Sequence, residues 1–167
     1  MNRLDFFIQR LTAQRECLRY TAELIADIEG PVFEIGLGKG RTYDFLRNTL
    51  PDREIFAFDR HVGSYPDCTP DIDHIILGDF RETLMTVSSQ TKGGVALAHC
   101  DFGSENRNSD NALALWLGPA LDRIMASNGL VATDREMKVD GWRPVELPPE
   151  VARRAYFLYR VPATVMA

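Results

Sequence analysis

One stretch of sequence decides how this chain folds: Glu34-Ile35-Gly36-Leu37-Gly38-Lys39-Gly40. Its glycines follow a short apolar run, residues 32–35, and precede a segment with helical character, residues 41–48. Glycine has no Cβ, so it adopts positive φ and lets a ligand lie against the backbone. The start of a helix adds unpaired N–H groups and positive partial charge, which suit a carboxylate or a polar nucleoside. The stretch therefore predicts a ligand-binding turn between a strand and a helix.

Strand patterns and helix patterns alternate on both sides of this turn. The expected strands are residues 32–35, 54–59, 72–77, 95–100 and 130–133, with two more in the tail at 143–147 and 155–161. The expected helices are residues 41–48, 81–88 and 112–125. Parallel strands need crossover helices, and right-handed crossovers place helices on both faces of the sheet. The pattern predicts an α/β fold with a doubly wound, mostly parallel sheet.

Residues 1–29 are expected to form a helical extension ahead of a Rossmann-like core at residues 31–161, within one domain of residues 1–167. Apolar side chains recur there at steps of three, four or seven: Leu4, Phe7, Ile8, Leu11, Leu18, Ala22 and Ile25. This helical stripe ends at the breaker pair Gly30-Pro31. We expect the helix to pack on the sheet or on a partner subunit, and a lid over the site is the alternative.

Composition narrows the class of protein. The 167 residues are 45% hydrophobic and 26% charged, which fits one globular domain. The formal net charge of −5 argues against a nucleic acid partner, because an acidic surface repels phosphate. Cys17, Cys68 and Cys100 lack C-x-x-C spacing, so reduced thiols are expected. With a charged N-terminus and no apolar run long enough for a bilayer, we expect a cytoplasmic protein with no membrane partner.

The glycine spacing distinguishes two kinds of cofactor. A dinucleotide fingerprint reads G-x-G-x-x-G, whereas here the third glycine comes one residue early and Arg41 stands in its place. The stretch resembles the first motif of class I S-adenosylmethionine-dependent methyltransferases, an acidic residue followed by G-x-G-x-G. The similarity covers residues 31–134. It implies S-adenosylmethionine as cofactor and a three-layer α/β/α, Rossmann-like fold with an antiparallel C-terminal strand.

The same resemblance assigns roles to the acids that end the strands. It implies that Glu34 helps to hold the methionine ammonium and that Asp59 binds the ribose hydroxyls. Asp79 would recognise the adenine amino group, while Phe80 packs on the ring. A carboxylate suits a vicinal diol, and its hydrogen bond to an ammonium is charge-assisted. The residues expected to bind the cofactor are Glu34, Gly36, Leu37, Gly38, Gly40, Arg41, Thr42, Asp59, Arg60, Gly78, Asp79, Phe80 and Asp101.

Asp101 and Asp134 end the fourth and fifth expected strands. Residues 99–134 are similar to small-molecule O-methyltransferases, whose metal-dependent members hold a divalent cation with acids at these positions and an Asn after the second. Such a cation lowers the pKa of a hydroxyl and orients it. Here Arg135 stands where the Asn is expected, and its charge disfavours a cation. We therefore expect no metal. If a metal were bound, Asp101 and Asp134 would be its candidate ligands.

We expect the protein to transfer a methyl group to a small molecule. Such a transfer needs mainly positioning and exclusion of water, because the donor is already activated. His61, Tyr65 and Asp101 are the candidate catalytic residues, whereas His99 lies in an apolar run and is expected in the core. Few residues follow Asp134, so acceptor recognition falls to the N-terminal helix, to loops or to another subunit of a homo-oligomer. A non-catalytic S-adenosylmethionine-binding module and a nicotinamide-dependent oxidoreductase remain alternatives.

Overall fold

Seven strands form one sheet in the computed structural model, which describes residues 2–89, 94–102, 107–153 and 155–163. They are β1 (Val32–Ile35), β2 (Ile55–Asp59), β3 (Ile75–Leu77), β4 (Val95–Cys100), β5 (Met125–Thr133), β6 (Arg143–Pro144) and β7 (Phe157–Arg160). The sheet order is β3-β2-β1-β4-β5-β7-β6. The first five strands pair in parallel, while β7 runs antiparallel to β5 and to β6. The predicted doubly wound sheet with an antiparallel C-terminal strand is confirmed.

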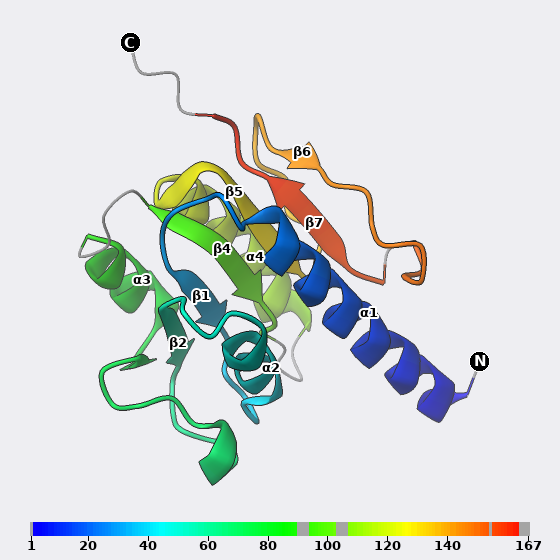
Figure 1. Cartoon of the computed structure of the whole chain (residues 1–167), viewed down its shortest axis with the longest axis horizontal. Coiled ribbons are helices and arrows are strands. Elements are labelled where there is room, and N and C mark those ends of the chain that lie inside the picture. The colour runs from blue at the N-terminus through cyan, green and yellow to red at the C-terminus, as the bar shows by residue number, and fades with distance from the viewer. Residues whose placement is uncertain (1, 90–93, 103–106, 154, 164–167) are drawn as a thin grey trace.

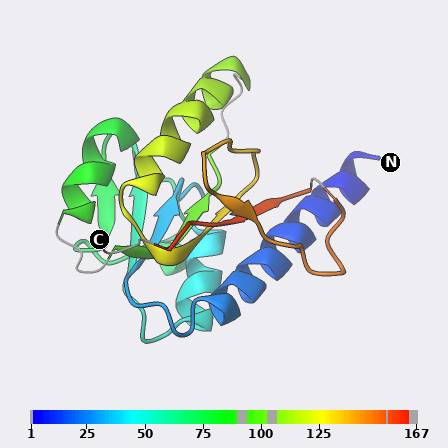
Figure 2. The ribbon, with the colours of Figure 1, turned by 90° about the horizontal axis from the view of Figure 1, so that it is seen from above.

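Four helices and one short 3₁₀ helix complete the described fold. They are α1 (Arg3–Leu24), α2 (Arg41–Thr49), η1 (Pro66–Cys68), α3 (Phe80–Ser88) and α4 (Arg107–Asp122). Figure 2 shows α1 and α2 on one face of the sheet and α3 and α4 on the other, which is the predicted three-layer arrangement. Among the helices described, none is long and apolar enough to cross a membrane.

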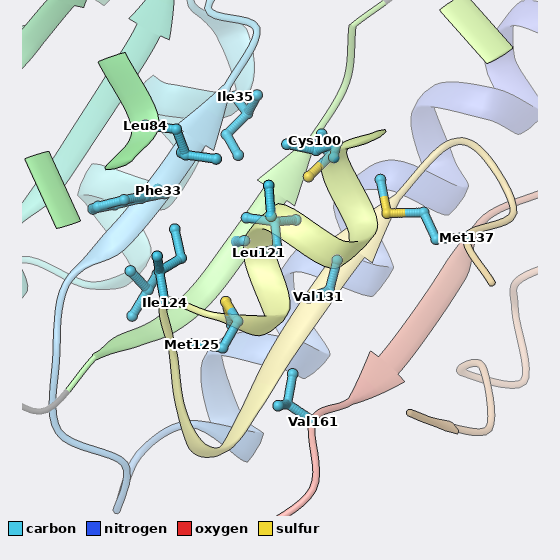
Figure 3. Packing of buried hydrophobic residues seen from close by; sticks show 14 of the residues in the cluster. Phe33, Ile35, Leu84, Cys100, Leu121, Ile124, Met125, Val131, Met137 and Val161 are labelled. Atoms are coloured by element: carbon cyan, nitrogen blue, oxygen red, sulfur yellow. The ribbon is translucent and has the colours of Figure 1, made fainter. Parts of the chain in front are cut away.

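Two apolar clusters hold the layers together, one on each face of the sheet. Between the sheet and the layer of α3 and α4, Phe33 and Ile35 of β1 pack with Leu84 of α3 and Leu121 of α4 (Figure 3). On the other face, β1 contributes Val32, beside side chains of α1 and α2. Successive side chains of a strand point to opposite faces, so β1 serves both clusters.

Helix α1 packs on the sheet along only part of its length. From Ala13 onward it has six buried residues: Ala13, Gln14, Cys17, Leu18, Thr21 and Ala22. Its N-terminal half extends beyond the body of the protein (Figure 1). The apolar side chains of that half are exposed: Leu4, Phe6, Phe7, Ile8 and Leu11. The predicted stripe is therefore covered by the sheet at one end of the helix and bare at the other.

Several predicted boundaries were wrong. Residues 72–74 form a turn, with Ile72 83% exposed, so β3 is shorter than the predicted strand 72–77. Strand β5 begins at Met125, ahead of the predicted residue 130, and its register with β4 shifts between Val95 and Leu97. Helix α4 covers Arg107–Asp122, so it begins and ends earlier than the predicted helix 112–125. Strand β6 covers only the start of the predicted strand 143–147.

A chain of polar side chains is buried in the middle of the sheet. His99 of β4 lies opposite Glu34 of β1, with 2.6 Å between its Nδ1 and a Glu34 carboxylate oxygen. Its Nε2 lies 2.5 Å from the hydroxyl of Tyr156. Burial lowers the pKa of His99, but the Glu34 carboxylate together with Asp101 and Asp134 outweighs burial, so the pKa of His99 is raised. Both ring nitrogens of His99 are thus paired inside the sheet, which fits the expectation that His99 is a core residue.

We expect Tyr156→Phe to lower the free energy of unfolding by about 1–3 kcal/mol, because the variant leaves a buried ring nitrogen of His99 without its hydrogen-bond partner. Chemical denaturation of the wild type and the variant measures this difference. Tyr65→Phe is the matched control, since Tyr65 is 46% exposed and its loss should change stability little. Equal stability of wild type and Tyr156→Phe would show that the hydroxyl contributes nothing.

Candidate active site

The glycine turn joins β1 to α2 through three residues with positive φ. Gly36 has φ 99°, and a Cβ on it would lie 2.3 Å from the carbonyl oxygen of Asp101. Gly40 has φ 79°, and a Cβ there would lie 2.3 Å from the carbonyl oxygen of Cys68. Gly38 has φ 52°, with no atom within 4 Å of where its Cβ would be. Two glycines are thus needed for close approach of the backbone, and the third leaves open space above the turn.

That open space is a cavity of about 390 Å³ at the carboxyl ends of β1, β2 and β4. Ligands of doubly wound sheets bind at this edge, where the strand order reverses. The cavity is lined by Gly36, Gly38, Asp59, Arg60, His61, Phe80, Arg81, Asp101, Phe102, Ser109, Asp110 and Leu113. We call it the donor cavity, after the methyl donor that the resemblance seen in the sequence would place here.

The donor cavity brings together about half of the predicted site residues. Those in its wall are Gly36, Gly38, Asp59, Arg60, His61, Phe80 and Asp101. Those outside its wall are Glu34, Leu37, Gly40, Arg41, Thr42, Tyr65, Gly78 and Asp79. Most of the second group shape the turn or the neighbouring elements, as their contacts show.

Asp59, the last residue of β2, is held by two backbone amides. The N–H of Gly38 donates to one carboxylate oxygen at 2.9 Å, and the N–H of Arg60 donates to the other at 2.7 Å. A carboxylate oxygen accepts more than one hydrogen bond. Asp59 is therefore fixed against the glycine turn with acceptor capacity left toward the cavity.

Two aromatic rings form part of the cavity wall. Phe80 opens α3, and Phe102 follows the end of β4, with their ring centroids 6.5 Å apart in an edge-to-face arrangement. Sequence reasoning missed Phe102, as it missed Arg81, Ser109, Asp110 and Leu113. The position of Phe102, directly after the acid that ends a parallel strand, is a signal that could have found it.

Glu34 has no exposed surface, although it is the acid of the glycine motif. One carboxylate oxygen accepts a hydrogen bond from the hydroxyl of Thr42, and the other faces His99. Leu37 is 2% exposed and packs in the core cluster beneath α1 and α2. These residues lie behind the turn and hold its shape.

Three other predicted residues also make local contacts. Asp79 caps α3, where its carboxylate accepts the backbone N–H of Arg81 at 2.9 Å. Arg41 lies over the ring of Tyr65, 5.8 Å from its centroid. Tyr65 and His61 are both exposed, but only His61 lies in the wall of the cavity. Of the candidate catalytic residues, His61 and Asp101 therefore border the donor cavity.

The acids after β4 and β5 are paired with arginines. Arg10 of α1 lies 2.7 Å from one Asp101 oxygen and 3.8 Å from Asp134, and the Gln14 amide donates to the other Asp101 oxygen at 2.6 Å. Arg135 lies 3.9 Å from Asp134. Burial, helped by Asp101 and opposed by the arginines, raises the pKa of Asp134 to about 6.

This arrangement does not fit a metal ion. Both oxygens of Asp101 carry hydrogen bonds from cationic or amide groups, and guanidinium groups lie beside Asp134. Within residues 2–89, 94–102, 107–153 and 155–163, no three His, Cys, Asp or Glu side chains are grouped so that they could hold one.

The chain is similar to known methyltransferases over nearly its whole length. A family model described as S-adenosyl-L-methionine methyltransferase matches residues 1–161. The crystal structure of an S-adenosyl-L-methionine methyl transferase from Silicibacter pomeroyi DSS-3 is 39% identical and covers 96% of this chain and 98% of that chain, with a TM-score of 0.89. A comparison with curated proteins gave no significant match.

More distant structures share the fold alone. The sugar N-methyltransferase KedS8 from Streptoalloteichus sp ATCC 53650 is 17% identical over 80% of this chain and 55% of that chain, with a TM-score of 0.53. A chain of the fibrillarin/Nop5p complex is 14% identical over 85% of this chain and 79% of that chain, with a TM-score of 0.51. The family match and the 39% identical structure decide against an oxidoreductase and against a non-catalytic module. The chain belongs to the S-adenosyl-L-methionine methyltransferase family and is an enzyme that uses S-adenosylmethionine as its methyl donor.

Proposed function

We propose that this methyltransferase binds S-adenosylmethionine in the donor cavity and transfers the methyl group to a small molecule. The observation that carries this proposal is the meeting of the glycine turn, Asp59 and two aromatic rings around one cavity at the edge where the strand order reverses. The turn offers backbone approach, Asp59 offers acceptors for a ribose diol, and Phe80 and Phe102 offer faces for a nucleobase.

The acids of the motif then divide their roles. Glu34 is closed off from the cavity, so it supports the turn through Thr42, and Asp101, which borders the cavity, is the acid that faces the ammonium. Asp79 caps α3 and so positions the neighbouring Phe80. Arg41, at the start of α2, lies against Tyr65 and stabilises the far side of the turn.

Methyl transfer requires few chemical roles of these side chains. The sulfonium supplies an activated methyl group when it is bound, so the residues of the cavity need to orient it and exclude water. His61 remains the candidate base for an acceptor that must lose a proton, because it borders the cavity. The net charge of −5 favours a small-molecule acceptor over a nucleic acid, because an acidic surface repels phosphate.

We also propose that the protein acts in the cytoplasm as a homo-oligomer and that residues 1–167 form one domain. The free thiols of Cys17, Cys68 and Cys100 suit a reducing compartment. The exposed apolar side chains of the N-terminal half of α1 suit a contact with a second copy, which would remove them from water. The helix lies against the core through six buried residues, so 1–29 and 31–161 form one unit.

Asp59→Asn should weaken S-adenosylmethionine binding by about 10-fold to 100-fold, because charge-assisted hydrogen bonds contribute about 1.5–3 kcal/mol. Calorimetry with S-adenosylmethionine and S-adenosylhomocysteine measures the effect. Asp52→Asn is the control of equal charge change, since Asp52 is exposed and lies outside the donor cavity. Unchanged affinity in Asp59→Asn would remove Asp59 from the ribose role.

Two glycine variants should separate folding from binding. Gly36→Ala places a Cβ against the Asp101 carbonyl and should lower the unfolding free energy strongly. Gly38→Ala meets no atom within 4 Å, so it should cost only about 1 kcal/mol for its left-handed backbone while its methyl group enters the donor cavity. Denaturation and calorimetry together test this pair. Full donor affinity in Gly38→Ala would place the ligand elsewhere.

For the homo-oligomer, analytical ultracentrifugation should find the wild type larger than one chain. Ile8→Glu should dissociate it, because a charge in an apolar contact loses its hydration. Leu115→Glu is the control: Leu115 is an exposed leucine of α4, remote in sequence from α1. A monomeric wild type, or equal dissociation by both variants, would contradict a contact through α1.

A further inference from the structure

The ends of β4 and β5 are bridged by a side chain from the other end of the sequence. Nη2 of Arg10 lies 2.7 Å from Oδ1 of Asp101 and 3.8 Å from Oδ2 of Asp134. Gln14, one turn further along α1, is 7% exposed and donates to the second Asp101 oxygen at 2.6 Å. Two carboxylates that would otherwise repel each other are therefore held around one cationic group.

A divalent cation between the same acids would need the position that the Arg10 guanidinium already occupies. Metal–oxygen bonds of about 2.0–2.6 Å require carboxylate oxygens that point at a common centre. Here Asp101 is bound by Arg10 and Gln14, and Arg135 supplies a second guanidinium 3.9 Å from Asp134. The like charges of these guanidinium groups would oppose a metal ion at this point.

The same ion pairs separate two cavities. Asp101 and Asp110 border the donor cavity, and their partners Arg10 and Arg135 border a second cavity of about 600 Å³. Phe6 and Gln9 of α1 also line the second cavity, as does Asp134. Oδ1 of Asp134 is buried and has no hydrogen-bond partner within the described residues. The second cavity therefore adjoins the donor cavity across a wall of paired charges.

We propose that the Arg10 guanidinium takes the place of a divalent cation between Asp101 and Asp134, so that methyl transfer beside the donor cavity needs no divalent metal ion. Arg10 is a positioning residue: it holds both carboxylates in place and keeps metal ions out. This proposal rests on the proposed binding of S-adenosylmethionine in the donor cavity.

The test is a titration with Mn²⁺, with and without saturating S-adenosylhomocysteine, in which electron paramagnetic resonance measures free Mn²⁺. Arg10→Met removes the positive charge that lies between the two carboxylates, so the variant should bind Mn²⁺ at least about tenfold more tightly than the wild type. Arg15→Met is the matched control, because Arg15 lies on the same helix and pairs only with Glu16 among the described residues. The gain should disappear in the double variant Arg10→Met/Asp134→Asn.

Equal Mn²⁺ affinity in the wild type and Arg10→Met would overturn the proposal, as would a gain that survives Asp134→Asn. If Arg10→Met does not fold, the Mn²⁺ affinities of the wild type and Asp134→Asn provide the test. Mn²⁺ binding to the wild type that is lost in Asp134→Asn would show a metal site and overturn the proposal. Equal Mn²⁺ affinity of the wild type and Asp134→Asn would support the proposal. Calorimetry with S-adenosylmethionine on the same proteins reports the donor cavity separately, so failure of the donor proposal is distinguished.

Discussion

The backbone of Gly36 passes so close to the carbonyl oxygen of Asp101 that a Cβ there would lie only 2.3 Å from it. This contact joins the end of β1 to the end of β4, the two central strands of the sheet. It brings Asp101 to the edge of the donor cavity and places Phe102 opposite Phe80. A larger residue at position 36 would separate these strand ends, so the shape of the whole site depends on the absence of one side chain.

Behind the turn, a buried polar chain supports the same pair of strands. Glu34 and His99 face each other in register, and each has a further partner, Thr42 and Tyr156 respectively. A buried carboxylate is costly unless its oxygens are paired, and here both are. The acid of the glycine motif therefore acts in this chain as an internal support, held by a histidine whose pKa the carboxylate raises.

The strand-helix alternation was sufficient to predict the sheet and its layers, because periodicity is a local property. The glycine spacing argued against a dinucleotide, and the resemblance of the glycine motif to a known family then implied the methyl donor. Ile72 was misplaced because an apolar residue in a turn looks like the start of a strand. The early start of β5 depends on a register shift against β4, which no local pattern records. Arg10 and Gln14 were missed because they meet Asp101 across 91 and 87 residues of sequence. Only the path of α1 over the sheet makes those contacts.

The position of α1 gives the enzyme a modular construction. The sheet and the glycine turn form the donor cavity, whereas the wall toward the second cavity is built in part by one helix that joins the sheet through the short link at Gly30 and Pro31. Changes on one face of α1 can alter the second cavity while Gly38 and Asp59 keep their places in the wall of the donor cavity. Diversification of such an enzyme can therefore proceed by replacing a single peripheral helix on an unchanged catalytic framework.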